Sequence, residues 1–318
     1  MDAPRVAVLG ATGFVGRAVV LAVEAAGGEV TSVSAPRIES SSRTVRDLVR
    51  EIGDLDRLRA QVTETLAGAD AVVNAAGVAS ADSGETGRLV GANAVLPRLA
   101  ADAALALGRQ VRLVHISTAA VQGPVEQLTE TAHTAPFSPY TWSKALGEAV
   151  LPEDERVIIY RPTSVHGPGR AVTHRLTRFA RSTLACVAGD GDRPTPQVLV
   201  QNVGSAAAEL ALGRRQPPRI VLHPWEGLST GSLLETLGGR EPRHLPYRAA
   251  ARLVRAGEYA GAQSTRLAAN VRRVQMLWFG QHQVDGWLDS TGWRPPGGLE
   301  AWKSLAAGVQ SPAAPRPG

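Results

Sequence analysis

The segment Tyr140-Thr-Trp-Ser-Lys144 places a phenol and an ammonium group four residues apart. On a helix, positions i and i+4 share a face, so the two side chains would be neighbours. At ~5 Å and an effective dielectric near 20, the lysine charge favours the phenolate by ~3 kcal/mol, or ~2 pKa units. The pattern predicts a tyrosine that exchanges a proton with a substrate hydroxyl or carbonyl near physiological pH. Lys144 and Lys303 are the only lysines in an arginine-rich chain, which indicates that a guanidinium does not replace Lys144.

Two hydroxyl side chains, Ser117 and Thr118, directly follow the apolar run Val111–Ile116. In a parallel sheet, ligands bind beyond the carboxyl ends of the strands. We therefore expect a hydroxyl here to hold the reacting oxygen beside Tyr140. The alternative is that both hydroxyls only cap backbone groups at the strand end.

A glycine-rich turn follows the first apolar run, in the order Gly10-Ala-Thr-Gly13-Phe-Val-Gly16. Gly10 permits a tight turn, Gly13 lets the backbone approach a pyrophosphate, and Gly16 lets the next helix pack closely on the strand. The helix N-terminus then offers free N–H groups to phosphate. A purely structural turn is the alternative. The predicted dinucleotide cradle consists of Gly10, Thr12, Gly13, Phe14, Val15 and Gly16.

The end of the second predicted strand indicates which dinucleotide binds. The run Glu29–Val33 continues into Ser-Ala-Pro-Arg37, without the carboxylate that would hold the ribose hydroxyls of NAD. Arg37 could instead pair with a 2′-phosphate. We therefore expect NADP as the cofactor, with NAD left open. A solvated loop charge is the alternative interpretation of Arg37.

The elements that position these groups alternate between strand-like and helix-like segments, which predicts an α/β fold with a doubly wound parallel sheet. Residues 1–162 should form a dinucleotide-binding domain, to which 198–223 return. Residues 163–197 and 225–308 should form a smaller, mostly helical substrate lobe, and 310–318 a disordered tail. The predicted strands are Arg5–Leu9, Val30–Val33, Ala71–Ala75, Val111–Ile116 and Val157–Tyr160, and the helices between them are Val15–Ala26, Leu55–Leu66 and Arg88–Leu107.

Composition narrows the class of protein further. The chain has 318 residues and a net charge of +5, but its arginines are spread among 29 acidic residues and aromatics are only 4%, so we expect no nucleic-acid partner. Every candidate apolar run is interrupted before 18 residues, so we expect no membrane partner. One cysteine and no basic, apolar leader predict a cytoplasmic protein. The histidines lack metal-ligand spacing, so we expect no metal site.

Together, the motifs resemble the extended short-chain dehydrogenase/reductase family. They are GATGFVG at 10–16, NAAG at 74–77, STAAVQG at 117–123, YTWSK at 140–144, RPTSVHGPG at 161–169, GDGDRPTPQVLVQNV at 189–203 and GWRP at 292–295. The resemblance implies that Tyr140 is the acid/base with Lys144 as its partner, and that Thr118 is the catalytic hydroxyl with Ser117 beside it. It also implies cofactor contacts from Asp54, Leu55, Ala75, Ala76, Gly77, Asn93, Tyr140, Lys144, Pro162 and Val165.

The chain departs from the family pattern at several positions. Gln122 and His166 stand where tyrosine is frequent, which makes both candidate substrate contacts. The strand around 197–203 lacks the arginine–aspartate pair of many nucleotide-sugar enzymes. Ala119 and Ala120 replace the acidic pair of sugar 4,6-dehydratases, which argues against dehydration.

Two arginines of the next predicted helix, Arg170–Ala185, could clamp a diphosphate: Arg175 and Arg178. A solvated helix face is the alternative. The expected function is NADP-dependent reduction of a ketone on a small, nucleotide-linked sugar. A nucleotide-sugar epimerase with tightly bound NAD and a non-catalytic NAD(P)-binding sensor stay open. The resemblance also implies a homodimer through the helices at 88–107 and 140–150.

Overall fold

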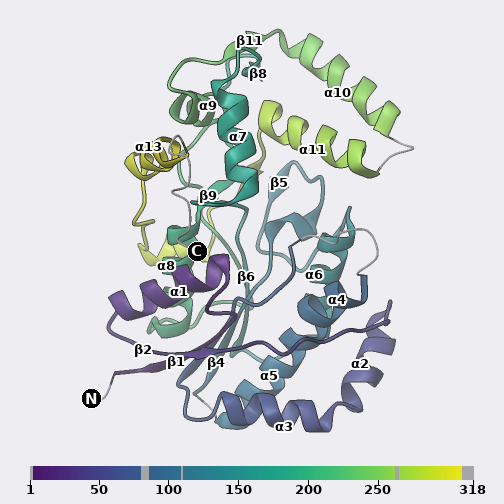
Figure 1. Ribbon diagram of the computed structural model, residues 1–318, viewed down its shortest axis with the longest axis vertical. Coiled ribbons are helices and arrows are strands. Elements are labelled where there is room, and N and C mark those ends of the chain that lie inside the picture. The colour runs from purple at the N-terminus through teal and green to yellow at the C-terminus, as the bar shows by residue number, and fades with distance from the viewer. Residues whose placement is uncertain (1–2, 80–85, 109, 262–264, 310–318) are drawn as a thin grey trace, which may run out of the picture.

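The computed structural model describes residues 3–79, 86–108, 110–261 and 265–309. Its centre is a six-stranded, fully parallel sheet in the order β10-β6-β4-β3-β1-β2 (Figure 1). This confirms the predicted α/β fold with a doubly wound sheet. The strands are β1 (Arg5–Leu9), β2 (Glu29–Val33), β3 (Ala71–Asn74), β4 (Arg112–Ile116), β6 (Val157–Arg161) and β10 (Ile220–Leu222).

The sheet is covered on both faces, because alternate residues of each strand enter two separate cores. In β1, Val6 and Val8 join the core beneath α1 (Phe14–Ala25) and α8 (Val200–Leu212). Ala7 and Leu9 join the other core, beneath α3 (Asp56–Thr65) and α5 (Leu96–Leu107). The two-residue period of a strand thus explains why these segments contain almost no polar residues.

The helix expected at 88–107 is longer and is interrupted. It comprises α4 (Thr86–Val90), a π turn at Gly91–Val95, and α5. A side chain at Gly91 would overlap the Ile38 carbonyl, so the glycine lets the segment after β2 cross closely. Taken together with the π turn, the helical segment Thr86–Leu107 is long and apolar enough to cross a membrane. However, 72% of its most apolar stretch is buried inside the protein, as in a core helix.

Within residues 1–162, the helix α2 (Val45–Gly53) was not predicted from the sequence. Its Leu48 and Ile52 are fully buried against Val95 and against Val150 of α6 (Pro139–Val150). In Figure 1, α2 lies beside α4, α5 and α6. Over this stretch α2 therefore covers the two helices that were expected to pair with a second copy, and the homodimer stays a prediction.

The lobe above the sheet has its own core, around the buried Trp302 and Leu234. Within 198–223, α8 packs on α1 and β10 pairs with β6, so this segment lies with the sheet. The predicted helix over 170–185 is shorter than expected, and Leu184, beyond its observed end, is 72% exposed. The elements of the lobe are α7 (Ala171–Arg181), β8 (Cys186–Ala188), α9 (Thr230–Gly238), β11 (Arg243–Leu245), α10 (Tyr247–Gly261), α11 (Thr265–Phe279) and α13 (Leu299–Gly308).

Short segments connect the lobe to the sheet. They are the 3₁₀ turn Ala119–Gln122, β5 (Gln127–Leu128) paired with β12 (His282–Gln283), β7 (Ser164–His166) paired with β9 (Gln197–Leu199), and α12 (Trp287–Thr291). The predicted tail at 310–318 lies outside the described residues.

Candidate active site

Two cavities lie on either side of the first turns of α6. The first has a volume of about 640 Å³ and is bounded by the glycine-rich turn after β1 and the end of β2. The second has a volume of about 270 Å³ and lies beyond the end of β4, beneath α11. Ser138 begins α6 with a capping box to Thr141, which fixes where the helix starts and therefore where Tyr140 projects.

The glycine-rich turn has the geometry that a dinucleotide phosphate requires. Gly10 has a φ of 77°, and a Cβ there would lie 2.8 Å from the Cα of Ala76. A side chain at Gly16 would overlap the Gly10 carbonyl, so the helix can approach the strand only through glycine. Gly13 precedes α1 without a side-chain cap and lines the cavity, so the free N–H groups of α1 open onto it.

The other residues of the predicted cradle differ in where their side chains go. Thr12 lines the first cavity. The Phe14 side chain turns away from this cavity and packs against Arg170, whose Cζ lies 4.8 Å from the centroid of the phenyl ring. Val15 packs on the sheet core. Only the backbones of Phe14 and Val15 could therefore serve a phosphate.

The far end of this cavity carries both signs of charge. Arg37 lines it, as expected for a residue that binds a 2′-phosphate, and Arg88 lies on the same wall. Glu39 also lines the cavity, and the sequence analysis had overlooked this carboxylate. By contrast, the exposed Asp54 directly follows α2, and Leu55 packs on the core around Leu48. The structure does not bring Asp54 or Leu55 to the cavity, because the chain leaves α2 there and Leu55 turns to this core.

The segment after β3 forms the wall between the cofactor cavity and α6. Ala75, Ala76 and Gly77 line the cavity. Asn93 is fully buried and bonds to both the N–H and the carbonyl of Val78 and to the Ser143 hydroxyl. Asn93 thus fixes this segment against α6, so that its amide is already satisfied within the protein.

Two predicted nicotinamide neighbours, Pro162 and Val165, follow β6. The carbonyl of Pro162 accepts a hydrogen bond of 2.9 Å from Ala119 N. Val165 packs against the sheet core. The structure places neither of them on the lining of either cavity, although Thr163 and Ser164 between them line the second.

Lys144 lies at the boundary of the cofactor cavity. Its side chain is buried, and Nζ donates a 2.9 Å hydrogen bond to the Ile116 carbonyl at the end of β4. A Cβ on Gly77 would lie 3.2 Å from Nζ, so the missing side chain leaves the ammonium adjacent to the cofactor cavity. Burial lowers the pKa of Lys144 to about 8, although Glu148, one turn further along α6, opposes the shift.

Tyr140 lies in the second cavity together with Thr118. Burial raises the pKa of Tyr140 above its usual value, although Arg170 and a hydrogen bond from Thr118 lower it. This differs from the expectation that Lys144 makes the phenol acidic, because burial of Tyr140 raises its pKa instead. The phenol keeps its proton at neutral pH.

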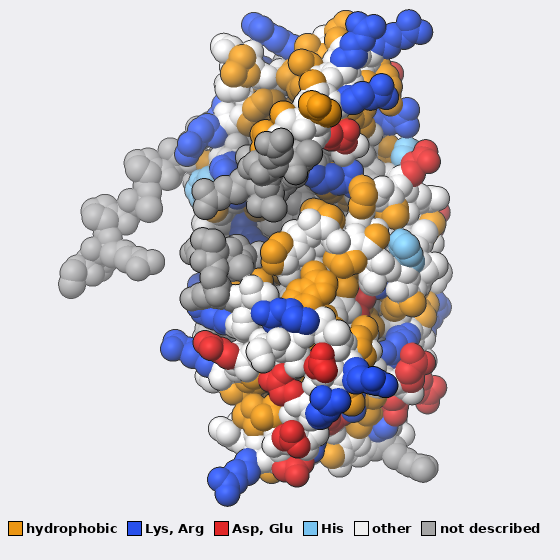
Figure 2. Space-filling model, turned by 90° about the vertical axis from the view of Figure 1, so that its right-hand side faces the viewer, with side chains coloured by type: hydrophobic (Ala, Val, Ile, Leu, Met, Phe, Trp, Pro, Cys, Tyr) orange, Lys and Arg blue, Asp and Glu red, His pale blue; other side chains and the backbone are white. Residues whose placement is uncertain are grey.

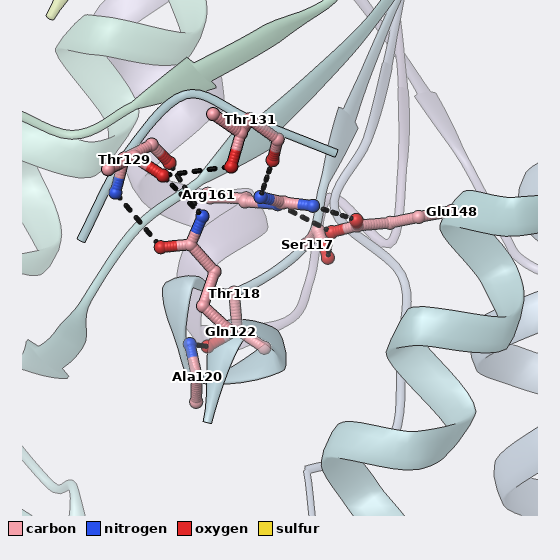
Figure 3. Close-up of polar contacts among 8 residues, drawn as sticks. All are labelled: Ser117, Thr118, Ala120, Gln122, Thr129, Thr131, Glu148 and Arg161. Atoms are coloured by element: carbon pink, nitrogen blue, oxygen red, sulfur yellow. Dashed lines mark hydrogen bonds and ion pairs between the residues drawn. The ribbon is translucent and has the colours of Figure 1, made fainter. Parts of the chain in front are cut away.

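Ser117 is separated from the cavity by a buried network, shown in Figure 3. Its hydroxyl donates to Glu148, and the Glu148 carboxylate also receives two bonds from Arg161 at the end of β6. Arg161 further donates to the Thr131 carbonyl at 2.7 Å. Of the two predicted hydroxyls, the structure thus leaves Thr118 in the cavity, while Ser117 anchors the middle of α6 to the sheet.

The two predicted substrate contacts serve other purposes. The Gln122 amide is buried, and it bonds the Thr129 carbonyl at 2.7 Å and accepts from the Thr129 N–H at 2.9 Å (Figure 3). His166 is buried and bonds Gln197 at 2.7 Å, and burial lowers its pKa to about 4. His166 lines a third cavity of about 450 Å³ between α7 and α13 rather than the one that contains Tyr140.

Two arginines missed by the sequence analysis line the cavity of Tyr140, whereas the two predicted ones do not. Arg175 and Arg178 are exposed on α7 and line none of the three cavities. Arg272 and Arg273 of α11 reach the cavity instead, and among the described residues the buried Nε of Arg272 has no hydrogen-bond partner. No sequence motif distinguishes these two among 32 arginines.

Comparison with known proteins agrees with this geometry. The model of the NAD dependent epimerase/dehydratase family matches residues 6–209. A ceramide reductase of Caulobacter vibrioides is 33% identical over 220 residues, which is 67% of this chain but only 61% of that protein. The match therefore covers less than two thirds of that relative.

Solved structures show the same fold. The human epimerase family protein SDR39U1 with NADPH has a TM-score of 0.63 at 22% identity, covering 95% of this chain and 99% of its own. The dTDP-4-dehydrorhamnose reductase of Bacillus anthracis with NADP has a TM-score of 0.61 at 17% identity, covering 95% and 98%. The UDP-glucuronic acid 4-epimerase of Bacillus cereus with NAD has a TM-score of 0.62 at 16% identity, covering 96% of each chain.

Proposed function

The chain belongs to the NAD dependent epimerase/dehydratase family, and we propose that within it the protein reduces a ketone with NADPH. The observation that carries this proposal is the pair formed by Tyr140 and Thr118 in the second cavity. A protonated phenol and a hydroxyl converge there, next to the wall that separates this cavity from the cofactor cavity. A site of this kind can bind a carbonyl oxygen and then protonate it.

The proposed mechanism assigns one task to each side chain. Bound NADPH supplies a hydride to the carbonyl carbon. The hydroxyl of Thr118 and the phenol of Tyr140 bind the carbonyl oxygen, and the Oη–H proton of Tyr140 is transferred to that oxygen, which completes the alcohol. Burial raises the pKa of Tyr140, so the phenol carries its proton when the ketone binds. The ammonium of Lys144 lies beside Gly77 and would help to hold the cofactor in the first cavity.

The preference for NADP over NAD rests on Arg37. Its guanidinium stands at the end of β2 on the cavity wall, where a 2′-phosphate would be bound. Glu39 lies on the same wall and could accept hydrogen bonds from the ribose hydroxyls of NAD. NAD is therefore the alternative cofactor.

For the substrate, we propose a ketone on a nucleotide-linked sugar. Arg272 and Arg273 supply the positive charge that a diphosphate requires, on the wall formed by α11. A second candidate is a ketone on an apolar chain, which the ceramide reductase relative suggests. The remaining walls favour it, because Leu128, Phe137 and Met276 offer no hydrogen bonds to a sugar.

Two measurements test this function. Nucleotide released from the denatured protein should be absent or exchangeable, and NADPH should be oxidised in the presence of nucleotide-linked keto-sugars or long-chain ketones. Tightly held NAD with sugar epimerisation would instead establish the epimerase. NADPH binding without oxidation by either class of ketone would contradict a reductase and indicate a sensor.

A further inference from the structure

The net positive charge of the protein is concentrated on two helices. The helix α10 has three arginines and one glutamate, and α11 has three arginines and no acidic residue. Their combined net charge of +5 equals that of the entire chain. The remainder of the protein is therefore electrically balanced, so an anionic partner would be attracted to this pair of helices.

The arginines of α10 form a single stripe. Ala250, Val254 and Gly261 are the buried residues of this helix and face α11. At 100° per residue, Arg248, Arg252 and Arg255 lie on the opposite face, together with Tyr259, and all four are exposed. The acidic residue of this helix, Glu258, lies on a flank and is close to Arg272 of α11, where burial lowers the pKa of the guanidinium and Glu258 opposes the shift.

Apolar side chains are exposed beside the arginines. Tyr259 is 88% exposed, and Leu253, beside the stripe, is 57% exposed. Among the described residues, five of the twelve exposed large hydrophobic side chains belong to α10 and α11: Tyr247, Leu253, Tyr259, Leu267 and Val274. Figure 2 shows Lys and Arg side chains with hydrophobic ones between them at the upper end of the molecule, where these helices lie in Figure 1.

We propose that the outward face of α10 (Arg248, Arg252, Arg255 and Tyr259), together with Leu253 on its flank, binds the surface of an anionic phospholipid bilayer. Arginines pair with lipid phosphates, while Leu253 and Tyr259 enter the boundary between headgroups and acyl chains. Nucleic acid fits less well, because a phosphate backbone would leave Leu253 in water. The sequence-based expectation of no membrane partner rested on the lack of a membrane-spanning segment. A helix that lies on the membrane surface does not require a spanning segment.

This surface adjoins the proposed active site. The partner helix of α10 contributes Arg272 and Met276 to the cavity that contains Tyr140. Docking through α10 would therefore bring that cavity close to the bilayer. Membrane binding is measured without substrate or cofactor, so it stands or falls independently of the proposed reductase activity.

The test is co-sedimentation of the full chain with vesicles of phosphatidylcholine alone or of equal parts phosphatidylcholine and phosphatidylglycerol. We expect sedimentation only with phosphatidylglycerol, weakened by salt. The variant Arg248→Glu/Arg252→Glu/Arg255→Glu should bind more than tenfold more weakly, since each basic side chain near the surface contributes about fivefold. The variant Leu253→Ser/Tyr259→Ser should weaken the binding that persists at high salt.

The matched control reverses three exposed arginines elsewhere, Arg57→Glu/Arg178→Glu/Arg214→Glu, and should bind like the wild type. Thermal melting shows whether each variant is folded, and Arg252→Ala alone, with an expected loss of about fivefold, replaces the triple variant if that one is not. Failure of the wild type to sediment with phosphatidylglycerol, or an equal loss in the control, would overturn the proposal. An oligonucleotide that binds α10 and displaces the vesicles would identify nucleic acid as the partner instead.

Discussion

Tyr140 and Lys144 lie one turn apart on α6 and approach different cavities. Tyr140 lines the cavity beneath α11, whereas Lys144 lies behind Gly77, which lines the cofactor cavity. The first turns of α6 thus connect the position of the proton donor with that of the cofactor. The C-terminal half of α6 holds the helix in place, because Glu148 binds Ser117 and Arg161. This fixes the positions of Tyr140 and Lys144.

The buried Lys144 should lower the free energy of unfolding of the protein at neutral pH. Its pKa of about 8 in the folded protein lies below the usual lysine value of 10.5, so the unfolded state binds more protons between these two values and stability rises with pH there. Below pH 8 the buried charge costs ~3 kcal/mol, against ~1 kcal/mol from the bond to Ile116. Lys144→Met should therefore have a free energy of unfolding ~2 kcal/mol higher than that of the wild type at pH 7. At pH 10 the two free energies of unfolding should be nearly equal. Urea unfolding at both pH values measures the difference. A variant less stable than the wild type at pH 7 would contradict this.

Arg37 should discriminate between the two dinucleotides. Arg37→Ala removes the guanidinium proposed to pair with the 2′-phosphate, which is worth ~1.5–3 kcal/mol as a charged hydrogen bond. The Kd for NADPH should rise by ~10–100-fold, whereas the Kd for NADH should change by less than about twofold. Titration of intrinsic fluorescence measures both. An equal loss for both nucleotides would show that Arg37 does not bind the 2′-phosphate.

Arg272 should bind the substrate, whereas Arg178 should not. Arg272 lines the cavity of Tyr140, and its buried Nε finds no partner in the part of the chain that the structure describes, whereas Arg178 is exposed on α7. Arg272→Gln should raise KM about tenfold or more for an anionic substrate, with a smaller effect on kcat. Arg178→Gln is the matched control and should leave KM unchanged. Steady-state kinetics with a nucleotide-linked ketone decides, and equal effects of the two variants would refute the assignment.

Glu148 should be essential for stability. Removing its carboxylate in Glu148→Ala leaves the Arg161 guanidinium buried without its ion-pair partner, with an expected loss of ~3–5 kcal/mol. Glu153→Ala, at an exposed position after α6, should cost less than ~0.5 kcal/mol. Urea unfolding of both variants measures the difference. A loss below ~1 kcal/mol in Glu148→Ala would show that Arg161 finds another partner.

The sheet could be predicted from the sequence because its pattern is local. Apolar runs such as Arg5–Leu9 match β1, and the glycine order at 10–16 requires the observed turn after it. The helix α2 was missed because Ser-rich residues precede it. Its apolar face, Leu48 and Ile52, is short and is buried only by packing against α6, which the local sequence does not reveal. That error also explains why Asp54 was assigned to the cofactor.

The substrate side could be predicted less well, because it depends on contacts between distant segments. Gln122 occupies a position typical of a substrate contact, but Thr129 satisfies its amide. Arg272 lies 132 residues after Tyr140, and only the placement of α11 over β4 brings them to one cavity. The raised pKa of Tyr140 likewise follows from burial, which the spacing of Tyr140 and Lys144 does not reveal.

The central claim is that the phenol of Tyr140 donates the proton in an NADPH-dependent reduction, and the most direct measurement compares the wild type with Tyr140→Phe. The variant keeps the ring but lacks the donated proton. Its kcat for NADPH oxidation by a ketone substrate should fall by ~10²–10⁴, while the Kd for NADPH and the unfolding temperature stay within error of the wild type. Undiminished turnover in Tyr140→Phe would contradict the account.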